Sequence, residues 1–248
     1  MPRKVDVASW GCGTISADRA MHLVLMPGMD GTGVLFQPLL EQLAPSESAC
    51  VIRYPGDEQL GYDELLATVE RALPTAGRYA LIAESFSGPL ALRVAARNPV
   101  GLAAVVLAAS FVTNPLRLVP RWAAALASPW LFATVPKHAQ AWAVFDGAPS
   151  EPLRELFREA QTQVLPAVMA ARARAIMRVD ATADLRACPV PVSYLQAIRD
   201  RVVSASCLRR NLVARPDVAV RRIDAPHLIL QTAPAQSLVA IRGLLAHA

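Results

Sequence analysis

Five consecutive residues, Ala83, Glu84, Ser85, Phe86 and Ser87, lie between an apolar run and a helix-like segment. A serine on a tight strand-to-helix turn carries its hydroxyl above the edge of a sheet, where it can attack a carbonyl carbon. Because this turn packs strand against helix, the positions two before and two after the serine must be small. Ala83 and Ser87 meet that requirement. The segment therefore predicts Ser85 as a nucleophile.

Ser87 offers a competing frame, in which Ser85 and Pro89 become the flanking residues. Proline is bulkier and fixes φ, so this frame fits the turn less well. With Ser85 as nucleophile, Pro89 falls in the first helical turn, where N–H groups have no partner inside the helix. We therefore prefer Ser85 as the nucleophile. Taken alone, the five residues would also fit an ordinary strand-to-helix junction in which both serines are solvated.

Glycines at positions 28, 31 and 33 follow another apolar run. In acyl transfer, the negative oxygen of the tetrahedral intermediate needs N–H donors that are already in place. A glycine-rich turn at a strand end can aim such a donor inward, and we expect the N–H of Met29 to act together with that of Phe86. The spacing matches neither the dinucleotide-binding nor the P-loop pattern, so nucleotide binding is not expected.

Asp200 lies just past the run 190–196. Ligands and catalytic groups of open α/β sheets collect at this end of the strands, which favours a catalytic carboxylate. The segment alone fits two other interpretations equally well. Asp200 could cap the next helix, or it could form an ion pair with Arg199 or Arg201.

His227 lies in the loop between the last strand-like run and the final helix. Of the four histidines it alone follows both a strand end and an upstream carboxylate; the others are His22, His138 and His247. The chain order serine, aspartate, histidine makes His227 the expected base. An imidazole that takes the serine proton, oriented by a carboxylate, is what a hydroxyl needs to become a nucleophile.

These residues need a scaffold that brings strand ends together. Short Val-, Leu- and Ile-rich runs, typical of buried parallel strands, cover 22–26, 49–54, 79–83, 103–109, 190–196 and 218–223. Helix-like segments cover about 33–43, 62–73, 86–98, 202–214 and 235–246. The alternation predicts an α/β fold with a mostly parallel central sheet and helices on both faces.

The segment from about 112 to 187 contains no clear strand, but it is rich in aromatic residues and prolines. Short helices separated by proline breaks are predicted there, forming a helical cap inserted into a single domain of residues 1–248. The aromatic side chains of this segment could line a pocket, or they could only pack the cap onto the core.

The composition excludes several other classes of protein. The chain has 248 residues, 54% of them hydrophobic, and a net charge of +5 without a basic block, so a nucleic-acid partner is not expected. Cys12, Cys50, Cys188 and Cys207 show no CxxC pair and are interpreted as small buried hydrophobes in a reducing compartment, not as a zinc site or a disulfide framework. The N-terminus lacks an apolar signal region, and the longest uncharged stretch, 122–136, is too short to span a bilayer. A soluble cytoplasmic protein with no metal and no cofactor is expected.

The motifs resemble the α/β-hydrolase superfamily, and in particular its capped esterase-like and monoacylglycerol-lipase-like members, from about residue 20 onward. The similarity rests on the run from Pro27 to Gly33, the serine turn, Asp200 and the Pro226–His227 pair. It implies Ser85 as nucleophile, Asp200 as acid, His227 as base, and Met29 and Phe86 as oxyanion donors. The chain departs from many relatives at Pro27, where they carry histidine, and at Ala83 and Ser87.

Three functions remain open on this fold. The first is hydrolysis of a small carboxylic ester or thioester through an acyl-enzyme. The second is acyl transfer to an alcohol with the same three residues. The third is slow turnover or ligand binding only. The residues that bind substrate, the acyl-chain length and the oligomeric state are not predicted.

Overall fold

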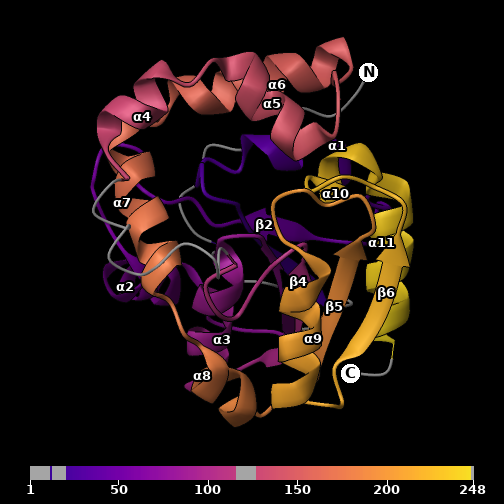
Figure 1. The fold of residues 1–248 in the computed structure, drawn as a ribbon. Helices are drawn as coiled ribbons and strands as arrows, with labels where there is room; N and C mark the ends of the chain where they lie inside the picture. The colour runs from indigo at the N-terminus through magenta and orange to yellow at the C-terminus, as the bar shows by residue number, and fades with distance from the viewer. Residues whose placement is uncertain (1–11, 13–20, 116–126, 247–248) are drawn as a thin grey trace.

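A computed structural model describes residue 12, residues 21–115 and residues 127–246 (Figure 1). Six strands, all paired in parallel, form one sheet in the order β2-β1-β3-β4-β5-β6. The strands are β1 (His22–Met26), β2 (Ala49–Val51), β3 (Tyr79–Glu84), β4 (Leu102–Ala108), β5 (Val192–Ala197) and β6 (Ala219–Ile223). Parallel pairing places every carboxyl end on the same edge, where the predicted site residues lie.

Strands at the middle of the sheet are apolar on both sides because helices cover both faces. Within β1, Val24 and Met26 enter one hydrophobic cluster, while Leu23 and Leu25 enter the other. The first face is covered by α2 (Tyr62–Ala72), α3 (Ser87–Ala96), α8 (Thr182–Ala187) and α9 (Ala205–Ala214). The second face is covered by η1 (Val34–Phe36), α1 (Gln37–Leu40), α10 (Ile229–Thr232) and α11 (Pro234–Leu245). The predicted α/β architecture is confirmed.

Two predicted elements next to the glycine-rich turn are shorter than expected, each for a local reason. The run 49–54 forms a strand only to Val51, because the chain then turns toward the glycine-rich loop and the N–H of Tyr54 bonds to the carbonyl of Gly31 at 2.8 Å. The helix predicted over 33–43 is a 3-10 turn followed by a four-residue helix with Pro38 in its first turn, a position that proline favours.

Between β4 and β5 the described residues form helices instead of strands. Four described helices precede α8: α4 (Pro129–Thr134), α5 (Lys137–Phe145), α6 (Glu151–Thr162) and α7 (Pro166–Arg178). In Figure 1, α4, α5 and α6 run across one end of the molecule, and α7 leads back toward the sheet. We call α4 to α7 the inserted helices. The prediction of several short helices broken by prolines is confirmed for the described part of this segment.

The cysteine prediction is wrong for two of the four residues. Cys12 and Cys50 form a disulfide across 38 positions, which joins residue 12 to β2. Sequence spacing gave no sign of this pairing, because the contact depends on how the chain folds over the sheet. Cys188 and Cys207 are free and buried, as predicted.

Some predictions concern residues outside the described ranges. They include the N-terminal segment apart from Cys12, part of the uncharged stretch 122–136, and His247. Within the described ranges, the helices are all too short or too polar to cross a membrane.

Candidate functional site

Ser85 stands at the turn between β3 and α3, as predicted. Its φ is 47°, in the left-handed region that non-glycine residues rarely adopt, and such strain is typical of functional turns. The turn is held on both sides. The N–H of Ser85 donates to the carbonyl of Ala108 at 2.9 Å, and the Ser110 hydroxyl donates to the Ser85 carbonyl at 2.5 Å. A Cβ on Gly88 would lie only 2.0 Å from the Ser110 oxygen, so the second residue of α3 must be a glycine.

His227 and Asp200 complete a chain of hydrogen bonds that begins at Ser85. The Nε2 atom of His227 lies 2.9 Å from the Ser85 hydroxyl oxygen, and its Nδ1 atom lies 2.9 Å from Oδ2 of Asp200. Because an ionised carboxylate only accepts, Nδ1 carries the proton and Nε2 is free to accept from the serine. The side chains of His227 and Asp200 are each 5% exposed, so little water competes for these bonds.

The second oxygen of Asp200 fixes the carboxylate in place. Oδ1 accepts from the N–H groups of Val202 and Val203, each at 2.8 Å. This turn delays the next helix, α9, which begins at Ala205 with Ser204 as its N-cap instead of near residue 202 as predicted. Asp200 therefore does not cap a helix.

The ion pairs that the sequence allowed for Asp200 form elsewhere. Arg199 pairs with Asp146 at 3.0 Å and with Asp224 at 2.7 Å, while Arg201 pairs with Asp146 at 2.5 Å. These contacts tie the loop that carries Asp200 to the end of α5. They also leave Asp200 to face the imidazole.

The glycine-rich turn lies beside the serine, as expected from its place after β1. The N–H of Gly31 closes the turn on the carbonyl of Gly28 at 3.0 Å, and Gly31 adopts a φ of 73°. Among the described residues, no protein group accepts a hydrogen bond from the N–H of Met29 or of Phe86.

Pro27 and Ser87, two of the positions where the motifs differ from the usual pattern, contact each other. The Ser87 hydroxyl donates to the carbonyl of Pro27, and it accepts from the Tyr54 hydroxyl at 2.5 Å. Ser87 is fully buried and already bonded on both sides, which makes it unsuited to act as a nucleophile. Its hydroxyl instead joins the serine turn to the end of β1.

Arg172, on α7, is fully buried against the glycine-rich turn. Its guanidinium donates to the carbonyls of Met29 at 2.9 Å, Asp30 at 2.7 Å and Pro55 at 2.8 Å. A Cβ on Gly31 would lie 2.6 Å from the Nη1 atom of Arg172, so this glycine is required by both its φ and the approach of the arginine. The inserted helices thereby hold the turn in one conformation.

Glu84 is buried directly before the serine. Its Oε2 atom accepts from the side-chain amide of Gln231 at 3.0 Å, while the other carboxyl oxygen has no hydrogen-bond partner within the described residues. Burial raises the pKa of Glu84 to about 8, and the charge of Asp30 adds to the effect. Glu84 is therefore mostly protonated at neutral pH.

Sequence reasoning missed Arg172, Tyr54 and the Glu84–Gln231 pair. A weak signal existed for Arg172, which lies four residues after the buried Val168 and so on the apolar side of its helix. For Tyr54 and Gln231 we find no signal in the sequence.

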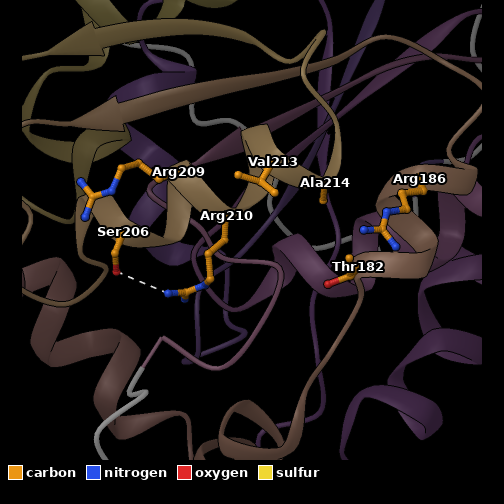
Figure 2. Close-up of a pocket in the computed structure, with 7 residues that line it drawn as sticks. All are labelled: Thr182, Arg186, Ser206, Arg209, Arg210, Val213 and Ala214. Atoms are coloured by element: carbon orange, nitrogen blue, oxygen red, sulfur yellow. Dashed lines mark hydrogen bonds between the residues drawn. The ribbon is translucent and has the colours of Figure 1, made fainter.

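Two cavities lie away from Ser85. One, of about 400 Å³, lies between α8 and α9; Figure 2 shows Arg186 and Thr182 on one side and Arg210 on the other. The second, of about 670 Å³, lies at α5 and α6 and is considered below. Among the described residues, the single cluster with metal-ligand spacing is Cys12, His22 and Cys50, and its two sulfurs are bonded to each other.

No family model matches the chain, and a search of curated proteins finds no match. The fold does match solved structures. A bromoperoxidase from Bacillus anthracis superposes with a TM-score of 0.76 at 14% identity, over 96% of this chain and 93% of that one. A carboxylesterase of Nitrososphaera gargenis gives 0.72 at 16% identity over 92% and 90%. An enol-lactonase from Burkholderia xenovorans gives 0.71 at 15% identity over 94% of each chain.

These similarities cover nearly the whole of each chain. At identities this low the match establishes the fold and not the activity. The chain has the α/β-hydrolase fold.

Proposed function

We propose that the protein is a serine hydrolase that cleaves a carboxylic ester or thioester through an acyl-enzyme on Ser85. The observation that supports this most strongly is the unbroken chain of hydrogen bonds from Ser85 through His227 to Asp200, at 2.9 Å each. Structural neighbours that are themselves an esterase, a lactonase and other hydrolases are consistent with the proposal.

In the proposed mechanism, the Ser85 hydroxyl attacks the acyl carbon while Nε2 of His227 takes its proton. Asp200 holds the imidazole in the tautomer that this step requires and stabilises the imidazolium that forms. The N–H groups of Met29 and Phe86 bind the developing oxyanion. His227 then protonates the leaving group, and water deacylates the enzyme by the same path in reverse.

The inserted helices have the place of a cap in this proposal. Arg172 connects α7 to the oxyanion turn, and the N–H of Leu228, next to His227, donates to the carbonyl of Val144 on α5 at 3.2 Å. Residues from α5 and α7 therefore contact the loops that carry the site. We expect the acyl group to lie between these helices and the edge of the sheet.

The test is Ser85→Ala, assayed on p-nitrophenyl esters of graded chain length. We expect turnover to fall by at least about a thousandfold, because removing the nucleophile of such a site leaves only binding and oxyanion contacts. Ser204→Ala, which changes an exposed serine on the same side of the sheet, is the matched control and should keep full activity. Turnover in Ser85→Ala equal to that of the wild type would overturn the proposal.

A further inference from the structure

A cavity of about 670 Å³ lies between α5, α6 and the loop that joins them. This volume is in the range of small-molecule sites in proteins. Ser85, Asp200 and His227 do not line it, so it is a space separate from the candidate active site.

One side of the cavity is aromatic and apolar. Phe157 packs edge-on against Phe145 with ring centroids 5.5 Å apart, which fixes its ring in the wall. Trp142 lines the cavity from α5 and is 53% exposed, which leaves a large apolar surface in contact with solvent. Such a wall suits an alkyl chain, because contact between them would remove apolar area of both the chain and the wall from water.

The charged side chains that line the cavity are two arginines. Arg154 and Arg158 lie on α6 at spacings of three and four residues around Phe157 and Gln161, so the four side chains share one face of the helix. His138 adds a third basic group from α5. Glu155 and Glu159 belong to other faces of α6, and no carboxylate lines the cavity.

These basic groups are only partly neutralised by the protein. Arg154 pairs with Glu151 outside the cavity, whereas Arg158 forms no ion pair within the described residues. An apolar wall beside an unpaired guanidinium complements a ligand with one alkyl chain and one anionic head.

The cavity wall also contacts the loops of the candidate active site. The guanidinium of Arg201, the residue after Asp200, stacks over the Trp142 ring at 4.3 Å from its centroid. From the same helix, Val144 accepts the hydrogen bond from Leu228 described above.

We propose that this cavity binds a single-chain anionic amphiphile such as a fatty acid. The alkyl chain lies against Trp142 and Phe157, and the carboxylate meets Arg158 with His138 beside it. The binding needs no turnover, so it stands whether or not the proposed hydrolysis is correct.

The test is displacement of a dansyl-labelled fatty acid from Ser85→Ala protein, below the critical micelle concentration of each competitor. The Ser85→Ala background removes covalent capture at the serine. The competitors are dodecanoate, dodecanol and butyrate. We expect dodecanoate to displace the probe most effectively, dodecanol less well because it lacks the charge, and butyrate least because it lacks the chain.

Two pairs of variants place the ligand. Trp142→Ala should weaken dodecanoate binding by about tenfold, while Trp130→Ala, which changes another exposed tryptophan of the inserted helices, should not. Arg158→Gln should weaken dodecanoate by about five- to tenfold and leave dodecanol unchanged, while Arg71→Gln on α2 removes an equal charge without effect.

Circular dichroism checks that each variant is folded, and Trp142→Phe replaces Trp142→Ala if the alanine variant is not. The proposal is overturned if dodecanoate fails to displace the probe. It is also overturned if Trp130→Ala weakens binding as much as Trp142→Ala, or if Arg158→Gln affects dodecanol and dodecanoate equally.

Discussion

The buried carboxyl of Glu84 makes the free energy of unfolding depend on pH, and a single substitution can separate this contribution from those of the other titrating groups. Burial raises its pKa from 4.5 to about 8, so the folded protein keeps a proton that the unfolded chain releases over this range. As pH rises from about 4.5 to about 8, folding is therefore progressively destabilised, and above about 8 there is no further loss. Glu84→Gln keeps the size of the neutral acid and removes the titration.

The magnitude follows from the size of the pKa change. At about 1.4 kcal/mol per pH unit, the loss reaches roughly 3 kcal/mol at pH 7 and is complete at roughly 5 kcal/mol above pH 8. Even half of this would be a large share of a typical unfolding free energy of about 5 to 15 kcal/mol.

The assay is urea unfolding of wild type and Glu84→Gln at several pH values between 4.5 and 9, followed by circular dichroism. Other titrating groups are common to both proteins, so the difference between the two curves reports Glu84. We expect Glu84→Gln to gain stability relative to wild type as pH rises, with the gain levelling off above about 8. The exposed Glu58→Gln should show no such trend.

A constant difference between wild type and Glu84→Gln across this pH range would refute the reasoning. It would mean that the carboxyl ionises in the folded protein as easily as in the unfolded chain. The environment between β3 and α10 would then be far more polar than the packing around Gln231 indicates.

Two further substitutions test the supports of the site. Arg172→Met should lower kcat on p-nitrophenyl esters about ten- to hundredfold with little change in KM, because a loosened glycine-rich turn misplaces the oxyanion donors. A change of the same size in KM, with kcat unaltered, would contradict this reasoning. Cys50→Ser should lower the free energy of unfolding, measured by urea titration under oxidising conditions, by about 3 to 4 kcal/mol. Wild type treated with dithiothreitol should be as stable as Cys50→Ser. Equal stability of wild type and Cys50→Ser without reductant would count against the disulfide.

The sequence predicted the strands well because parallel strands covered on both faces are apolar throughout and stand out from their surroundings. It also predicted which residues meet, since Ser85, Asp200 and His227 each follow a strand and parallel strands end at one edge. The aspartate was ambiguous from its own segment. Its second oxygen accepts from the N–H groups of Val202 and Val203 ahead of α9, so Asp200 orders the turn before that helix but does not cap it.

The contacts that hold the site were not predictable, because they join segments far apart in the chain. Arg172 is between 117 and 143 residues from the carbonyls it binds, and no local pattern specifies a partner at that distance. The disulfide between Cys12 and Cys50 is a similar case. Periodicity shows which side of a helix is buried, but it does not show what that side is buried against.

The departures at Pro27 and Ser87 show why single positions of a motif are hard to judge alone. Pro27 still presents a carbonyl at the end of β1, and the Ser87 hydroxyl needs an acceptor once it is buried. Leaving that hydroxyl unpaired would cost about 1 to 3 kcal/mol, so its bonds to Pro27 and Tyr54 make the serine acceptable where glycine is usual. The two positions are therefore compatible because they contact each other, and the glycine-rich turn is tied to the nucleophile turn by a bond that a glycine at position 87 could not make.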